Sequence, residues 1–176
     1  MDPLAHPEQL VRRVYAYAAY RLGDGPDAED ATSDTFERAL CYRRSYDRQK
    51  GEPAAWLLGI ARRCVDDVFA ARPPISDVDL DSPAPGNLDA DAIRRLSVRD
   101  AVQRLDDRSR ELVALRYGAD LTARQIGELL GERTNTVEVA LHRALAKLRS
   151  VLADEDAGEE DSPGRPARGL HYTRAL

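Results

Sequence analysis

Apolar residues recur every three or four positions through the first seventy residues, and this spacing predicts three helices. The first spans Pro7 to Leu22, where a glycine-rich turn stops it. The second runs from Pro26, a suitable first-turn residue, to about Tyr42. The third begins at Pro53 and ends at two consecutive prolines, which cannot continue a helix. We therefore expect residues 1–72 to form a compact helical domain.

The second of these helices also carries many acidic residues, and this limits how it can lie. If its acidic side chains stay in solvent, one face of the helix is left to pack inward. The positions that can face inward are Ala31, Thr35, Leu40 and either Phe36 or Ala39. The two cysteines of the chain, Cys41 and Cys64, lie in helical segments with apolar neighbours. We expect two buried thiols and no disulfide.

The helical pattern resumes after an irregular stretch and predicts a second domain over residues 92–152. The apolar positions of its first helix are Ile93, Leu96, Val102 and Leu105. Those of its second helix, which ends at Gly118, are Leu112, Val113, Leu115 and Tyr117.

The last part of this domain has the signals of a helix-turn-helix. Thr122 and Gln125 have the spacing of a capping box, in which each side chain satisfies a free backbone donor. Gly131 can close that helix in a left-handed turn, and Thr134 or Asn135 can cap the next one. The apolar positions of the final helix are Val137, Leu141, Ala144, Leu145 and Leu148. Two helices joined so tightly predict a helix-turn-helix, although a helical hairpin inside a bundle shows the same pattern.

A helix-turn-helix presents the start of its second helix to the major groove of DNA, where arginines and short polar side chains reach base edges. In this sequence those residues are Arg133, Thr134, Asn135 and Thr136. The basic residues farther along, spaced to meet phosphates, are Arg143, Lys147 and Arg149.

Composition excludes several classes of function. The chain has 176 residues, of which 43% are hydrophobic, but it has no apolar run long enough to span a membrane and no signal peptide. We expect a cytoplasmic protein. The three histidines are scattered, and the adjacent Asp66 and Asp67 point about 100 degrees apart on a helix, so they do not form an acid–base pair. We expect no metal site, no cofactor and no enzymatic activity.

The net charge of -5 is unusual for a DNA-binding protein, but the charges are segregated along the chain. Acidic blocks lie within residues 24–37, 77–91 and 154–161, with basic residues gathered between them. Residues 73–91 are rich in Pro, Asp, Ser and Gly, which predicts a flexible acidic linker. Its charge serves either solubility or mimicry of nucleic acid in a basic channel. Residues 153–176 lack periodicity, and we expect a disordered tail.

The order of these segments resembles one known family closely. Three stretches carry the resemblance: AEDATSDTFERAL, WLLGIARRCVDDVFAARPP and LDDRSRELVALRYGADLTARQIGELLGERTNTVEVALHRALAKLR. They are similar to group IV sigma factors, the extracytoplasmic function type, which keeps only sigma regions 2 and 4. The resemblance covers residues 8–150 or thereabouts. It implies an all-α fold, with region 2 at 1–72 and region 4 at 92–152. It also implies a dissociable promoter-specificity subunit of bacterial RNA polymerase.

In that family, the helix matching residues 30–40 docks on the clamp helices of the polymerase beta-prime subunit, and the beta flap is a further contact on the polymerase core. The residues at the matching positions are Asp30, Asp34, Thr35, Phe36 and Arg38. An acidic surface suits a basic partner, so the resemblance gives the first acidic block a protein to face. Phe36 is open to a second interpretation, as a core residue.

The resemblance assigns the loop from Ser45 to Glu52, and the helix after it, to melting and recognition of the minus-10 promoter element. A melted strand is held by basic side chains along its backbone and by a base extruded into a pocket. The residues that can hold the backbone are Arg48, Lys50, Arg62, Arg63 and Arg72. Trp56 is either a stacking platform or a core residue, and we favour the core.

The helix-turn-helix matches the region that binds the minus-35 element as a duplex, but it departs from the family's pattern. The family often has a small polar residue at the position of Arg133, and polar or basic residues at the positions of Glu138, Val139 and Ala140. Glu138 either accepts a hydrogen bond from cytosine or repels DNA, and we expect low or unusual minus-35 affinity. The departures in the first domain are Ser33 and Arg63, where glutamine and asparagine are common.

Two other functions stay open at this point. A conventional helix-turn-helix regulator binds duplex operators alone as a dimer, yet the exposed positions of the first domain are acidic and offer no apolar dimer face. A sigma-like protein without promoter recognition acts only as an interaction module, which Glu138 and the net charge would allow. Within the family, an anti-sigma protein that clamps the two domains is a typical further partner.

Overall fold

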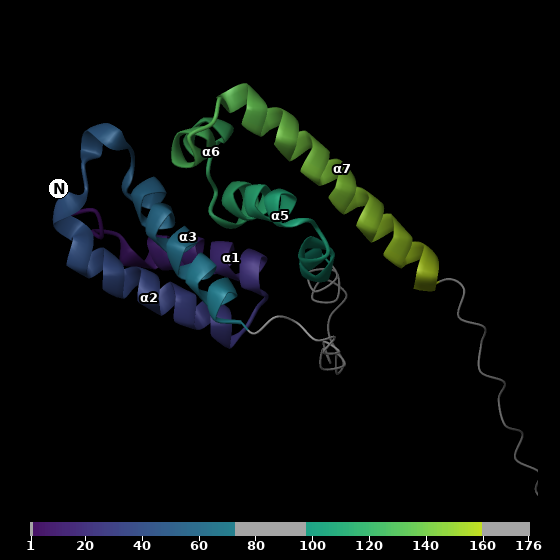
Figure 1. Cartoon of the computed structure of the whole chain (residues 1–176), viewed down its shortest axis with the longest axis horizontal. Coiled ribbons are helices and arrows are strands. Elements are labelled where there is room, and N and C mark those ends of the chain that lie inside the picture. Colours follow the sequence, from purple (N-terminus) through teal and green to yellow (C-terminus); the bar gives the residue numbers. More distant parts are fainter. Residues whose placement is uncertain (1, 73–97, 160–176) are drawn as a thin grey trace, which may run out of the picture.

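The computed structural model describes residues 2–72 and 98–159, and all regular structure within those ranges is helical (Figure 1). The first part contains α1 (Pro7–Leu22), α2 (Pro26–Tyr42), the 3-10 turns η1 (Arg43–Ser45) and η2 (Arg48–Lys50), and α3 (Pro53–Ala71). The second part contains a helix over 98–103, α5 (Asp107–Val113), the π-helical turn η3 (Ala114–Gly118), α6 (Ala123–Leu130) and α7 (Thr134–Glu159). The all-α prediction is confirmed for these residues. The predicted linker at 73–91 lies outside them, as do Ile93 and Leu96.

Each of the first three helices has a proline in its first turn, where a missing N–H costs nothing and a fixed φ favours the helix. Gly23 and Gly25 connect α1 to α2 with φ values of 95° and 151°, which L side chains rarely adopt. The predicted bounds of α1 and α2 are confirmed. The third helix ends at Ala71, just before the pair of prolines.

Helix α2 packs against α1 and α3 through a stripe of small residues, and this corrects part of the predicted inward face. Ala31, Thr35 and Ala39 are buried, and the Thr35 hydroxyl donates to the carbonyl of Ala31 at 2.6 Å. Leu40 was predicted to face inward, but it is 57% exposed. Cys41 is exposed too, so only the Cys64 thiol is buried as predicted. Successive residues are about 100° apart around a helix, so Leu40 and Cys41 turn away once Ala39 fixes the buried stripe.

The helix-turn-helix forms as the sequence predicts. Thr122 accepts from the backbone N–H of Gln125 at 3.2 Å, and the Gln125 side chain accepts from the N–H of Thr122 at 2.9 Å. Gly131 closes α6 with a φ of 72°. At Gly127, a Cβ atom would lie 2.7 Å from the carbonyl oxygen of Glu132, so the turn folds back onto α6 at a position that accepts only glycine.

One expectation for the second part of the chain was wrong, and one of its apolar positions lies in solvent. Tyr117 is 52% exposed, because two helical steps beyond the buried Leu115 reach the opposite side of a helix. The tail was expected to lack structure from residue 153, but α7 continues to Glu159. Residues 160–176 lie outside the described residues.

The two parts of the chain share one hydrophobic core. Helix α1 packs against η3 and α5, and α3 contacts α6, so that α5 lies between α7 and the α1–α3 group (Figure 1). Leu115, Leu121 and Ile126 belong to the same buried cluster as Tyr17 and Leu57. The sequence predicted two small domains joined by a linker. The structure adds an extensive contact between them.

Candidate functional site

The start of α7 is an exposed element among those predicted to bind DNA. Its inner side is fixed by the buried Val137, Leu141 and Ala144, which hold the helix against the core. The predicted base-contacting residues are all exposed in or just before its first turn: Arg133, Thr134, Asn135 and Thr136. This places the four residues together at one accessible end of the helix-turn-helix.

The three predicted phosphate contacts on α7 differ in their surroundings, and one of them, Arg149, is exposed. Arg143 is exposed and has no ion-pair partner within the described part of the chain. The ammonium nitrogen of Lys147 lies 2.5 Å from Oδ2 of Asp106, whose other oxygen caps α5 by accepting from the N–H of Ser109 at 3.0 Å. The hydrogen bond from Lys147, with those from Ser109, lowers the pKa of Asp106 well below its ordinary value. Lys147 therefore ties α7 to α5 in this arrangement.

The loop between α2 and α3 borders a cleft of about 470 Å³. Tyr46 packs edge-on against Trp56 with 5.6 Å between ring centroids, and its hydroxyl donates to the carbonyl of Gly51 at 3.1 Å. Trp56 also packs partly against the core, so it holds the loop and lines the cleft at once. On the side of α6, the cleft is lined by Gln125, Glu128 and Leu129.

The five basic residues predicted for the minus-10 element fall into two groups. The ones that are exposed and have no ion-pair partner in the described ranges are Arg48, Lys50 and Arg63. Arg72 pairs with Asp27 at 2.5 Å and lies over the ring of Phe69. Nε of Arg62 lies 2.7 Å from Oε1 of Glu111, a residue of the second part. Arg62 and Arg72 are thus engaged within the protein.

The α2 surface predicted to bind polymerase is only partly accessible. Asp30 and Asp34 are exposed one turn apart, and Phe36 is half-buried against the core. Arg38 forms an ion pair with Asp67 of α3 at 2.8 Å. Thr35 is fully buried, so its side chain cannot meet a partner, and we leave it out of the surface.

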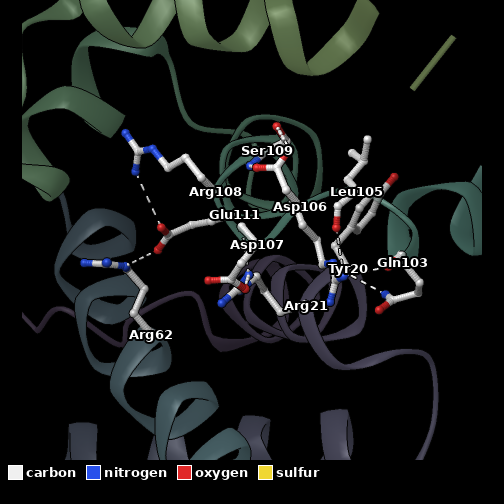
Figure 2. A network of polar contacts seen from close by, with 11 residues as sticks. Tyr20, Arg21, Arg62, Gln103, Leu105, Asp106, Asp107, Arg108, Ser109 and Glu111 are labelled. Atoms are coloured by element: carbon white, nitrogen blue, oxygen red, sulfur yellow. Dashed lines mark hydrogen bonds and ion pairs between the residues drawn. The ribbon is translucent and has the colours of Figure 1, made fainter. Parts of the chain in front are cut away.

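Polar contacts between the two parts of the chain are the feature that sequence reasoning missed. Nη1 of the buried Arg21 lies 2.6 Å from Oδ1 of Asp107 at the start of α5. Glu111 forms ion pairs with Arg62 of α3 and, at 3.6 Å, with Arg108, and Figure 2 shows both contacts. Burial lowers the pKa of Arg62, but the hydrogen bond to Glu111 and its charge leave that pKa above the ordinary value.

The backbone of the second part also meets α1 directly. Arg13 donates to the carbonyls of Ala119 and Asp120 at 2.6 and 3.1 Å. At Gly118, a Cβ atom would lie 3.0 Å from the carbonyl oxygen of Ala16, so the two backbones approach closely. These partners are about a hundred residues apart in sequence, and no local pattern identifies them.

The structure thus combines a capped helix-turn-helix with a three-helix unit that carries a basic loop. This combination is typical of a helical protein that binds DNA through two parts. Residues 8–72 match the family described as Sigma-70 region 2, and residues 95–148 match Sigma-70, region 4. The chain belongs to the sigma-70 family of RNA polymerase sigma factors, in the extracytoplasmic function group.

Two relatives and one solved structure illustrate the similarity of this chain to known sigma factors. The chain is 31% identical over 160 residues to "ECF RNA polymerase sigma factor BldN" of Streptomyces coelicolor, covering 84% of this chain but 59% of that protein. It is 30% identical over 149 residues to "ECF RNA polymerase sigma factor SigK" of Mycobacterium ulcerans, covering 80% of each. The sigma factor RpoE from Bartonella quintana, solved with the anti-sigma factor NepR, shares the fold with a TM-score of 0.62 and 21% identity, over 82% of this chain and 92% of that one. In the described ranges, no helix combines the length and the apolar character needed to cross a bilayer.

Proposed function

We propose that this chain recruits bacterial RNA polymerase core to specific promoters and assists promoter melting, in the cytoplasm and without catalytic chemistry of its own. The observation that carries the proposal is the exposed first turn of α7, where Arg133, Thr134 and Asn135 stand free on a capped helix-turn-helix. In a member of the sigma-70 family, such a turn suits the minus-35 duplex.

The other surfaces divide the remaining work. Asp30 and Asp34, beside Phe36 and Arg38, form the proposed contact with the beta-prime clamp helices, while the second part meets the beta flap. Lys50 and Arg63 line the cleft, Arg48 lines a neighbouring hollow beside Lys50, and all three are free to hold the backbone of the melted strand. Arg62 and Arg72 join them only if their present ion pairs open.

An anti-sigma protein is a further proposed partner. The solved structure of the relative RpoE contains one, bound to a chain of the same fold. The acidic face of α2 and the boundary between the two parts of this chain are the surfaces available to such a regulator.

Run-off transcription with purified core polymerase, on a pool of promoter fragments, tests the proposal. We expect specific transcripts that are lost with Asp34→Arg, since this exposed carboxylate lies on the proposed polymerase surface. Glu8→Arg is the matched control, because Glu8 is an exposed acidic residue in the first turn of α1 and should leave the transcripts unchanged.

Other outcomes point elsewhere. Tight binding to duplex DNA without polymerase, and no transcript, would identify a stand-alone helix-turn-helix regulator. Neither activity would identify a sigma-like interaction module. Equal loss of transcription in the two charge-reversal variants would contradict the assignment of α2.

A further inference from the structure

One apolar side chain is exposed on the solvent-facing side of α7. Val139 is 44% exposed, and it is the only large hydrophobic residue so exposed among the α7 side chains that the structure describes. Elsewhere on that helix, the valine and leucine that are fully or nearly buried, Val137 and Leu141, face the core. Among the described residues, Val139 is not one of those that pack against either buried cluster.

Helix geometry fixes the direction in which Val139 points. The buried Val137, Leu141 and Ala144 define the inner side of α7. Two helical steps beyond Val137, at about 100° each, place Val139 on the opposite side. Asn135 is four residues earlier and lies on the same face, one turn nearer the start of the helix. Any molecule that binds this face of α7 therefore contacts Val139 and Asn135 together.

The chemistry around Val139 identifies that molecule as duplex DNA. Arg133 and Arg143 are exposed at either end of the same stretch, and neither has an ion-pair partner in the described part of the protein. Free guanidinium groups flanking an amide and an apolar side chain suit phosphates on each side of a base edge. A β-branched residue is also a weaker helix former than alanine, so helix stability gives no reason for valine at an exposed position.

Only one group in the major groove is apolar, the C5-methyl of thymine. We propose that Val139 packs against a thymine methyl in the minus-35 duplex and makes the protein select thymine at that base pair; this rests on the proposed promoter-binding function. The side-chain amide of Asn135 pairs with the N6 and N7 edge of an adenine at a neighbouring base pair. The α7 face thus prefers A·T pairs where these two residues touch.

The test removes the C5-methyl group from the DNA and the two γ-methyl groups of Val139 from the protein, in separate experiments. Holoenzyme, made from core polymerase and the full chain, binds a promoter fragment identified by run-off transcription. Each thymine of its minus-35 duplex is replaced in turn by deoxyuridine, which lacks only the C5-methyl. We expect one replacement to weaken binding of the wild-type holoenzyme about four-fold, the loss for one methyl-sized group withdrawn from apolar contact.

The variant Val139→Ala should show the weaker binding on the unmodified promoter, with no further loss at that deoxyuridine. Val11→Ala is the matched control, because Val11 is a valine of α1 with a similar exposure of 42% and no role in DNA contact. It should keep the full deoxyuridine effect. If Val139 contacts the thymine methyl, the loss of binding caused by Val139→Ala and the loss caused by deoxyuridine do not add. A general weakening of the helix would leave the two losses additive.

Two results would overturn the inference in different ways. If no thymine replacement matters to the wild type, or if Val139→Ala keeps the same sensitivity, Val139 does not read a methyl group although promoter binding stands. If no fragment supports transcription, the proposed function fails, and this inference fails with it.

Discussion

The ion pair between Arg62 and Glu111 is the contact between the two parts whose loss is easiest to measure. The substitution Glu111→Gln keeps the shape of the side chain and removes its charge. Side-chain exposure is 30% for Arg62 and 15% for Glu111, so solvent screens this pair far less than a surface pair.

The expected loss follows from the hydrogen bonds. A charge-assisted hydrogen bond contributes about 1.5–3 kcal/mol and a neutral one about 0.5–1.5 kcal/mol. Glu111 accepts from Arg62 at 2.7 Å and lies 3.6 Å from a second guanidinium, that of Arg108. Together these contacts predict a loss of about 2 kcal/mol, which corresponds to a melting temperature about 6 °C lower for a chain of this size.

Urea and thermal denaturation of the full chain measure this loss. The control is Glu128→Gln, the same substitution in an i,i+4 pair with Arg124 whose side chains are 54% and 80% exposed. Its effect should stay within about 0.5 kcal/mol. The double variant Arg62→Gln/Glu111→Gln should lose less stability than the sum of the losses in the two single variants, because both substitutions remove the same interaction. Equal destabilisation by Glu111→Gln and Glu128→Gln would refute the reasoning.

Two further predictions concern the second part of the chain. Gly127→Ala should destabilise the protein by about 1–3 kcal/mol in urea unfolding, because the new Cβ meets the Glu132 carbonyl at 2.7 Å. Gly59→Ala should not destabilise it, because the new Cβ would lie at an ordinary contact distance of 3.6 Å from the Leu129 side chain. Lys147 lowers the pKa of Asp106, so this carboxylate stabilises the fold above the ordinary aspartate pKa and ceases to do so as the pH falls through its own lower value. Melting temperatures measured from pH 7 downward should therefore fall less steeply for Asp106→Asn than for the wild type, and parallel curves would contradict this.

Local signals in the sequence were enough to place most helices. Prolines in the first turns, the Thr122–Gln125 capping box and Gly131 act within a few residues of where they stand, and each element they predicted is present. The rotation of a helix about its own axis was harder to predict. Leu40 was predicted to face inward, but the neighbouring helices cover another face of α2.

Contacts between distant segments were beyond the sequence. Arg62 looks like a free phosphate ligand in a basic stretch, and nothing near it indicates that Glu111, 49 residues later, would lie against it. The same holds for Arg21 and Asp107, 86 residues apart. Such pairs depend on how the two parts dock, which follows from shape and apolar area over many residues. The roles proposed for Asp34, Arg63 and Asn135 stay predictions until the binding experiments are done.

The shared core also bears on how tightly any partner binds. A partner that needs a surface now covered by the other half of the chain binds only the molecules in which the halves have separated. Its apparent dissociation constant is its intrinsic value divided by that separated fraction. Each additional 1.4 kcal/mol or so that holds Leu115 and Leu121 against α1 and α3 thus weakens the observed affinity about tenfold, without altering a single atom of the binding surface. Sequence changes inside this core therefore change the apparent affinity of any such partner without changing the residues that bind it.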